Sequence, residues 1–259
     1  MKRFEGRVCL VTGSTGIAAA AARAMADEGG RVFVVSKTAD HAIGLADEFD
    51  AGWAAGDLTQ EEAVESAVRA CIVRFGRIDA VYNVAGISGR RFGDGPLHEM
   101  TLDGWRTVID NNATSIALVC RAAIRQMLTQ EPAADGRRGV LLNMSSVLAR
   151  RPEPGHFATH AYAASKGAIE ALTRSAAAYY AKDGIRINAI APGLVATPMS
   201  QRAQTGEGIV EFAKRKQPFA EGGLLKPEDL VGTALYLLSD ESRMVTGQVI
   251  DVDAGWGLS

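Results

Sequence analysis

The chain of 259 residues is predicted to adopt an α/β fold, with one parallel sheet doubly wound by helices on both faces. Short apolar, β-branched runs alternate along the chain with longer segments of helical character. A first run at 7–12, the glycine turn Gly13–Gly16, a helix and a second run at 31–36 make a βαβ unit. Because no repeat or low-complexity linker interrupts the alternation, we expect one domain over 1–259.

Each predicted element follows from its composition. Buried strands are short, apolar and β-branched, as at 7–12, 31–36, 53–55, 77–82, 140–142, 185–190 and 248–252. Helices are expected between them at 17–28, 39–49, 61–75, 162–182 and 228–238, and two helical stretches are expected over 101–129 with Asn111 and Asn112 in the middle. Alanine favours the first of these helices, Glu61 and Glu62 suit the start of the third, and Gly29 and Gly184 follow two helix ends.

Polar residues and glycines gather at the carboxyl ends of the predicted strands. In sheets of this kind, ligands bind beyond those ends, at the switch in strand order. The residues concerned are Gly13–Gly16, Ser36, Asp57, 83–86, Ser145, Ser146, Pro192 and Gly193. Their shared position predicts a ligand site at this edge of the sheet.

Composition and charge exclude several classes of partner. A hydrophobic share of 47% and a charged share of 22% are ordinary for a globular protein. The net charge of −2, without long Lys/Arg blocks, argues against a nucleic acid or an anionic membrane surface as the partner. No run of about 18 apolar residues is present, and the apolar stretch near the start is too short for a signal peptide.

The three cysteines give neither a disulfide framework nor the spacing of metal ligands. Cys9, Cys71 and Cys120 are scattered, and each lies among apolar residues as a core thiol does. His156 and His160 have no third ligand near them in the sequence, so we expect no metal. A reducing, cytoplasmic compartment is the simplest expectation.

Tyr162 and Lys166 are the first candidate catalytic pair. They lie four residues apart in an alanine-rich helix and therefore on one face of it. A phenol with an ammonium beside it is a tunable proton donor and acceptor. The pair also suits a solvated helix face, since the spacing arises by chance about once in a chain of this length. Whether the pair is catalytic therefore depends on the other motifs in the sequence.

The glycine turn after the first strand is the candidate phosphate site. Backbone N–H groups in such a turn approach a pyrophosphate, and the following helix adds positive potential. Gly13 and Gly16 are present, whereas Ala18 stands where a dinucleotide fingerprint has its third glycine. The turn by itself equally fits an ordinary strand-to-helix connection.

The end of the second strand favours NADP(H) over NAD(H). An acidic residue here binds the ribose diol of NAD, whereas a basic one accommodates the 2′-phosphate of NADP. Ser36 and Lys37 supply a hydroxyl and an ammonium, and no carboxylate stands there to repel a phosphate. NAD(H) is the alternative, with Lys37 simply pointing to solvent.

Together these motifs resemble the short-chain dehydrogenase/reductase family, in its compact single-domain branch, over nearly the whole chain. The resemblance rests on Thr12–Ala18, Asp57, 83–86, Asn112, Ser146, Tyr162-Ala-Ala-Ser-Lys166, Pro192, Gly193 and Thr197, in that order. It implies a seven-stranded, Rossmann-like parallel sheet, NAD(P)(H) as cofactor, and assembly as a homotetramer or homodimer.

The resemblance also implies roles for the matching residues. Asn112, Ser146, Tyr162 and Lys166 match the catalytic tetrad of the family. The residues expected to bind the cofactor are Gly13, Ser14, Thr15, Gly16, Ile17, Ser36, Lys37, Asp57, Leu58, Asn83, Ala85, Gly86, Tyr162, Lys166, Pro192, Gly193, Val195 and Thr197. Gly13 and Ile17 would border the pyrophosphate, and Asp57 with Leu58 would hold the adenine. Pro192, Gly193 and Thr197 would contact the nicotinamide.

Two departures from the family pattern are visible. The glycine turn is one residue shorter than usual, and the methyl group of Ala18 is expected to fit only if the helix lies slightly farther from the sheet. The interval from Ser146 to Tyr162 is longer than usual. Ser146 rather than Ser145 is assigned to the tetrad because residues 143–146 align best that way.

The resemblance implies oxidoreduction of a secondary alcohol or ketone. A free tyrosine has a pKa near ~10, and we expect the Lys166 ammonium and an oxidised nicotinamide to favour the phenolate. Tyr162 would exchange the alcohol proton as hydride moves between substrate and nicotinamide. Ser146 would hold the substrate oxygen, and Asn112 would position a water beside Lys166.

The substrate pocket is expected between the residues after Ser146 (Val147 and Leu148), His156 and Phe157, and the segment 194–223. That segment is long, contains glycines and has the character of a lid. Arginine pairs at 90–91 and 150–151 leave adjacent strand ends. Pointing inward they would bind an anionic substrate, whereas pointing outward they would be surface or subunit contacts.

Two rival functions stay open on the same fold, because a fold does not fix a function. One is a catalytically silent dinucleotide-binding protein, an alternative that stays open because the glycine turn is shorter than usual. The other is a family member that uses the same site for dehydration or epimerisation. Cofactor titration and a panel of ketones and secondary alcohols separate these from an oxidoreductase.

Overall fold

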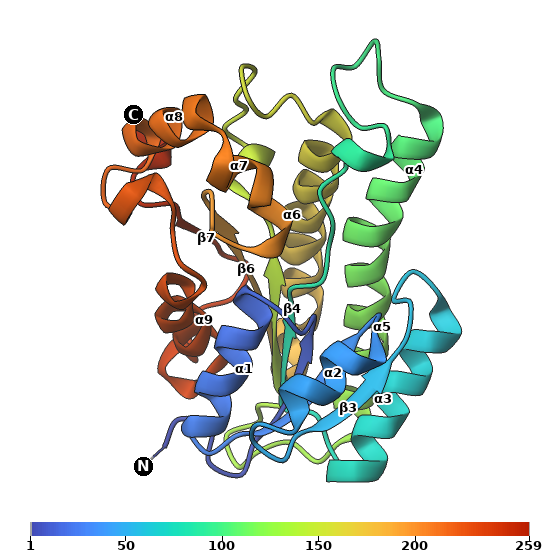
Figure 1. Cartoon of the computed structure of the whole chain (residues 1–259). Coiled ribbons are helices and arrows are strands. Elements are labelled where there is room, and N and C mark those ends of the chain that lie inside the picture. Colours follow the sequence, from blue (N-terminus) through green and yellow to red (C-terminus); the bar gives the residue numbers. More distant parts are fainter. Residues whose placement is uncertain (1, 259) are drawn as a thin grey trace.

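Parallel strands form a single sheet through the middle of the molecule (Figure 1). The computed structural model describes residues 2–258, without the side chain of Glu207, and within them the sheet has seven strands. They are β1 (Val8–Thr12), β2 (Arg31–Ser36), β3 (Gly52–Ala55), β4 (Ala80–Asn83), β5 (Gly139–Met144), β6 (Ile185–Pro192) and β7 (Val249–Val252). The order is β3-β2-β1-β4-β5-β6-β7. Successive strands are added on one side of β1 up to β3 and on its other side from β4 onward, so the switch in strand order lies between β1 and β4. The predicted doubly wound, Rossmann-like sheet is confirmed.

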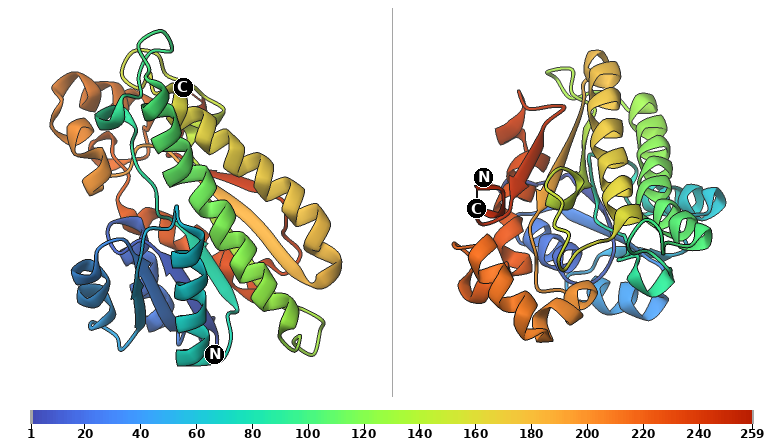
Figure 2. Two further views of the ribbon diagram at one scale, coloured as in Figure 1. Left: turned by 90° about the vertical axis from the view of Figure 1, so that its right-hand side faces the viewer. Right: turned by 90° about the horizontal axis from the view of Figure 1, so that it is seen from above.

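Helices cover both faces of the sheet (Figure 2). One face carries α1 (Ile17–Asp27), α2 (Ala39–Ala46) and α9 (Val231–Leu238), and the other carries α3 (Glu61–Phe75), α5 (Ser115–Thr129) and α6 (His160–Tyr180). Along β1, Cys9 and Val11 belong to the first core, and Val8 and Leu10 to the second. A strand buried on both faces needs apolar side chains at every position, which explains the continuous apolar runs in the sequence.

The two helical stretches expected over 101–129 are joined by a π-helical turn. α4 (Leu102–Ile109) continues through Asp110–Thr114, which is π-helical, into α5. Asn112 lies in this turn and is completely buried. Such turns are rare and occur frequently at functional sites, because they redirect side chains that a regular helix would place elsewhere. The pair Asn111 and Asn112 marks the place of this turn in the sequence, although it does not indicate the π-helical form.

The segment 194–223 is more regular than the sequence indicated. It contains two short helices, α7 (Gln201–Thr205) and α8 (Glu207–Lys216), which lie above the carboxyl ends of the strands in Figure 1. Ile209 and Ala213 are buried one helical turn apart, a spacing that could have revealed α8. The other predicted elements agree with the observed ones to within three residues at each boundary.

The three cysteines are free, buried thiols of the core. Burial raises the pKa of Cys9, Cys71 and Cys120 to about 12, which keeps each thiol protonated and unreactive. Over residues 2–258, no helix has both the length and the apolar character needed to cross a bilayer.

Candidate active site

The glycine turn between β1 and α1 has the geometry of a phosphate site. Gly13 and Gly16 have φ angles of +96° and +54°, which favour glycine, and the Gly13 N–H donates to the Val35 carbonyl at 2.7 Å. The first turn of α1 contains no acidic residue that would offset its positive end. A pyrophosphate therefore fits the residues present.

Ala18, the departure from the three-glycine pattern, packs directly against Gly13. A side chain built at Gly13 would place its Cβ 3.2 Å from the Ala18 Cβ, and Ala18 is 1% exposed. The methyl group thus occupies space that any residue but glycine at position 13 would need. The turn accommodates Ala18 because Gly13 has no side chain.

The residues expected near the adenosine ribose are paired with one another. The Ser14 hydroxyl donates to the Ser36 hydroxyl at 2.9 Å, and Lys37 Nζ lies 2.6 Å from Asp57 Oδ2. The hydrogen bond from Lys37 is the main reason why the pKa of Asp57 lies below its usual value. The expectation that no carboxylate lies at this point is wrong, because the fold brings Asp57 to Lys37 from the end of another strand.

Residues 83–86 are held between β1 and β5. The Thr12 hydroxyl accepts hydrogen bonds from the N–H groups of Val84 and Ala85 at 3.0 and 3.2 Å. Asn83 is fully buried, and its amide donates to Asn143 Oδ1 at 3.0 Å. These bonds fix the backbone after β4 beside the glycine turn, where the cofactor residues Ala85 and Gly86 were expected.

Three members of the expected tetrad meet at the start of α6. The Ser146 hydroxyl lies beside the phenol of Tyr162 and acts to lower its pKa, and Tyr162 is partly exposed. Lys166 is 3% exposed, and its Nζ lies 5.5 Å from the centre of the Tyr162 ring and donates to the Met144 carbonyl at 2.8 Å. Ser146, Tyr162 and Lys166 thus form one group at the carboxyl end of β5.

Burial dominates the proton affinities of this group. Desolvation raises the pKa of Tyr162, opposed by its hydrogen bond with Ser146, and lowers the pKa of Lys166 to about 8. The expectation that the Lys166 ammonium favours the phenolate is therefore not met in the protein alone. A neutral phenol beside a lysine that ionises within the physiological range is a proton-donating arrangement.

Asn112, the fourth member, braces the loop that follows β4. Its amide oxygen accepts from the Ile87 N–H at 2.7 Å, and its amide nitrogen donates to the Ile87 carbonyl and the Ser165 hydroxyl, both at 3.1 Å. A side chain built at Gly86 would approach Asn112 Oδ1 to 2.8 Å and Lys166 Nζ to 3.8 Å. Both amide hydrogens are in use, so one lone pair of Oδ1 is left for a water near Lys166.

The two adjacent serines have different surroundings. The Ser145 hydroxyl donates to Glu170 Oε1 at 3.0 Å, whereas the Ser146 hydroxyl accepts from the Leu148 N–H at 3.2 Å and meets Tyr162. Only Ser146 of the pair acts on the pKa of the phenol. The structure therefore places Ser146, as the alignment of 143–146 suggested, beside Tyr162.

The arginine pair at 150–151 is neutralised. Arg150 pairs with Glu170 at 3.0 Å and with Asp251, and Arg151 pairs with Asp251 at 2.6 Å and Asp253 at 3.2 Å. These carboxylates occupy both guanidinium groups. The hypothesis that this pair binds an anionic substrate is therefore wrong.

The residues expected at the nicotinamide lie next to the glycine turn. A side chain built at Gly16 would approach Thr197 Cγ2 to 3.0 Å, although 181 residues separate the two in the chain. The Gly193 N–H donates to the Val252 carbonyl at 3.1 Å, and Val195 is buried and paired with Leu225. The fold thus joins the two ends of the expected cofactor site.

The remaining cofactor candidates lie on the same edge of the sheet. Thr15 is exposed at the tip of the glycine turn, Ile17 begins α1, and Leu58 packs beside the α3 core after Asp57. Pro192 is the last residue of β6. The sequence therefore placed each of these residues correctly at a strand end or helix start.

Sequence analysis missed Gln217, which holds the segment 194–223 at its base. Gln217 is fully buried; it accepts a hydrogen bond from the Leu194 N–H and donates to the carbonyls of Leu194 and Gly223 at 3.0 and 2.9 Å. One side chain therefore ties both ends of the segment together. A polar residue in a charged, exposed stretch gives no signal of this role.

Aromatic rings join α8 to the loop before α6. Phe212 lies 5.1 Å from His156, 6.3 Å from Phe157 and 5.5 Å from Trp256, measured between ring centres. His156 and Phe157 were expected to line the substrate pocket. Their contact with Phe212 places the helical segment 194–223 directly against that loop.

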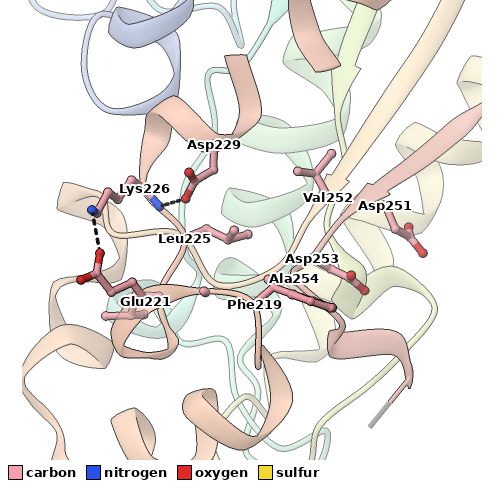
Figure 3. A pocket seen from close by; sticks show the side chains of 11 residues that line it. Phe219, Glu221, Leu225, Lys226, Asp229, Asp251, Val252, Asp253 and Ala254 are labelled. Carbon is pink, nitrogen blue, oxygen red and sulfur yellow. Dashed lines mark hydrogen bonds and ion pairs between the residues drawn. The ribbon is translucent and has the colours of Figure 1, made fainter. Parts of the chain in front are cut away.

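A hollow of about 440 Å³ lies between the segment after α8 and the end of β7 (Figure 3). It is bordered by 219–229 and 251–254, with Lys226 paired to Glu221 at 3.2 Å. No residue expected in catalysis or cofactor binding lines it. The hollow lies at the carboxyl end of β7 and is not lined by the candidate residues.

Comparisons with known proteins agree with this geometry. A family model described as enoyl-(acyl carrier protein) reductase matches residues 11–257. The chain is 35% identical to cis-4-hydroxycyclohexanecarboxylate dehydrogenase of Sinomonas cyclohexanicum, over 98% of this chain and 97% of that protein. It is 34% identical to 3-oxoacyl-(acyl-carrier-protein) reductase of Thermotoga maritima, over 98% of each.

A solved structure supports the same assignment. A short-chain type dehydrogenase/reductase from Mycobacterium marinum has a TM-score of 0.87 at 27% identity, covering 99% of this chain and 97% of that one. The matches extend through the glycine turn, the start of α6 and the last strand. The protein belongs to the short-chain dehydrogenase/reductase family of oxidoreductases.

Proposed function

We propose that the protein transfers a hydride between NAD(P)(H) and a secondary alcohol or ketone, with Tyr162 as general acid and base. The observation that carries this proposal is the Tyr162 ring, with Lys166 Nζ 5.5 Å from its centre and Ser146 beside its phenol, at the sheet edge that holds the glycine turn. The relatives are named as a dehydrogenase of a hydroxy compound and a reductase of an oxo compound, which supports both directions.

The residues divide the proton chemistry between them. The Ser146 hydroxyl would hold the substrate oxygen next to the phenol, and Tyr162 would donate its proton to a forming alkoxide during reduction. Lys166 would help to return that proton through the water that Asn112 is expected to position beside it, and burial lowers its pKa to about 8. During oxidation the phenol must first ionise, and the charge of an oxidised nicotinamide nearby would oppose the effect of burial. The cofactor supplies the hydride chemistry when bound.

NADP(H) is the proposed cofactor, and NAD(H) is the alternative. Gly13 and Gly16 would hold the pyrophosphate, and Lys37 would meet the 2′-phosphate. Lys37 is already paired with Asp57 at 2.6 Å, so a 2′-phosphate must share or replace that carboxylate. The preference for NADP(H) is therefore expected to be moderate rather than absolute.

A two-step experiment separates this function from its rivals. Fluorescence titration with NADPH and NADH tests cofactor binding, and a panel of ketones and secondary alcohols followed at the reduced-nicotinamide absorbance tests turnover. Binding with hydride transfer supports the proposal. Binding without any turnover would identify a silent dinucleotide-binding protein. Product formation without net change in the nicotinamide would identify a dehydratase or epimerase.

A further inference from the structure

Two arginines from distant parts of the chain converge on one carbonyl oxygen. Arg90, in the loop after β4, donates to the His156 carbonyl at 2.6 Å, and Arg202, in α7, donates to the same oxygen at 2.9 Å. The His156 carbonyl belongs to the loop before α6. Two guanidinium groups therefore lie side by side with a single neutral acceptor between them.

Neither guanidinium has a carboxylate partner among the described side chains. The ion pairs of residues 2–258 within 4 Å include neither Arg90 nor Arg202, and Arg202 otherwise faces the Phe157 ring at 6.0 Å. Asp94, the acidic group that acts on Arg90, is bound to backbone N–H groups of α6. Both guanidinium side chains belong to exposed residues, and the pKa of Arg90 is lowered by partial desolvation and by the charge of Arg202, against the opposing charge of Asp94. An anion placed here would relieve this repulsion.

The position of the pair relates it to the proposed reaction centre. Arg90 lies three residues beyond Ile87, which is bonded to Asn112, so its Cα is within about 11 Å of the Ile87 Cα. His156 lies six residues before Tyr162, and Arg202 lies five residues after Thr197. The three segments that meet at the pair thus each lead away from a residue of the candidate site. Each of the three segments meets the pair within six residues of a residue of that site.

An apolar surface adjoins the two charges. The rings of Phe157, Phe212 and Trp256 lie between 5.5 and 6.3 Å from one another, and His156 joins them through Phe212. Guanidinium groups beside an aromatic cluster suit a molecule with an anionic end and an apolar body. The alternative candidates, Arg150 and Arg151, are neutralised by carboxylates.

We propose that Arg90 and Arg202 bind the carboxylate of the substrate, so that the enzyme acts on hydroxy acids or oxo acids with an apolar carbon frame. This inference rests on the proposed function, because it assigns the substrate class of the same site. The carboxylate displaces or shares the bonds that both guanidinium groups now give to the His156 carbonyl. The carbon frame lies along the aromatic rings, and the carbinol carbon reaches Tyr162.

The test compares Arg90→Gln, Arg202→Gln and the double variant on matched substrates. Cyclic hydroxy acids are paired with their methyl esters, which keep the shape and lose the charge. Each single change should lower kcat/KM for the acid by about 10–100-fold, mostly through KM, since a charge-assisted hydrogen bond has about that effect. Activity on the ester should change less than about twofold, which also shows that the variants are folded.

Arg91→Gln is the matched control. Arg91 is the neighbour of Arg90 in the chain, is exposed, and should have no effect on either substrate. Equal turnover of acid and ester by the unaltered enzyme would overturn the assignment, as would equal losses on both in the variants. A phosphate monoester preferred tenfold over the acid would overturn the choice of a carboxylate.

Binding measured without turnover distinguishes this inference from the proposed function. Calorimetric titration of cyclohexanecarboxylate and its methyl ester into the cofactor-loaded protein needs no reaction. Acid binding that is lost in the Arg90→Gln, Arg202→Gln double variant supports the anion site even if no alcohol is oxidised. Turnover of esters and neutral ketones with no acid binding would keep the oxidoreductase proposal and reject the anion site.

Discussion

The Asp94 carboxylate accepts a hydrogen bond from the backbone N–H of Tyr162 at 3.0 Å. Its other oxygen accepts from the Ala161 N–H, also at 3.0 Å, and Asp94 is 7% exposed. Asp94 lies in the loop after β4, 68 residues before Tyr162, yet it caps the first turn of α6. A carboxylate at this end of a helix is favourable, and here it fixes the turn that carries the proposed acid/base.

Asp94→Ala should lower the free energy of unfolding by about 1–2 kcal/mol, as the loss of a helix cap does. It should also lower kcat more than it raises the KM for the cofactor, because the first turn of α6 positions Tyr162. Denaturant unfolding and steady-state kinetics measure the two effects. Asp103→Ala, an exposed acid in the first turn of α4, is the control. Equal kinetic effects of both changes would contradict the positioning role.

Tyr162→Phe should lower kcat by about 10²–10⁴-fold, which is the usual contribution of a positioned general acid or base. The affinity for NADPH, measured by fluorescence titration, should change little because the ring remains. Retention of more than a tenth of the activity would show that another group transfers the proton. Ser145→Ala is the matched control, because the Ser145 hydroxyl donates to Glu170 rather than meeting the phenol.

The burial of Lys166 should make the free energy of unfolding depend on pH. Burial lowers its pKa from 10.5 to about 8, so the unfolded chain holds this proton more tightly than the folded one. Burial of the charge therefore costs stability below pH 8, and the cost disappears as the pH rises from about 8 to 10.5. Relative to Lys166→Met, the native protein should gain about 3 kcal/mol across that range.

The measurement is urea unfolding of both proteins at several pH values. Other titrating groups cancel in the difference, and Lys214→Met, an exposed lysine of α8, corrects for the loss of one charge. A difference that stays flat between pH 8 and 10.5 would show that the Lys166 ammonium is not desolvated.

Lys37→Gln should reduce kcat/KM for NADPH by about tenfold and leave that for NADH within about twofold, because only the 2′-phosphate needs the ammonium. The ion pair with Asp57 is exposed and contributes at most about 1 kcal/mol to stability, so the variant should remain folded. Lys226→Gln, which breaks a similar exposed pair with Glu221, is the control. Equal losses with both cofactors would assign Lys37 a role unrelated to the phosphate.

Local patterns in the sequence determined the alternation of strands and helices, the glycine turn and the Tyr162–Lys166 spacing. Each of these depends on residues a few positions apart, where helix pitch and strand period fix the geometry. The resemblance to a family then assigned roles to residues at strand ends, and the order of the sheet agrees with it.

The tertiary structure alone decided the contacts between distant segments. Asp94 at the start of α6, Asp57 against Lys37, Gln217 at the base of 194–223, and Arg90 beside Arg202 all join residues whose separation in the chain carries no periodic signal. In the sequence, a polar side chain with such a distant partner cannot be distinguished from an exposed polar residue. The pairing becomes visible only when the fold brings the two groups within about 3 Å. The proton affinities of Tyr162 and Lys166 are likewise set by burial, which composition and spacing do not reveal.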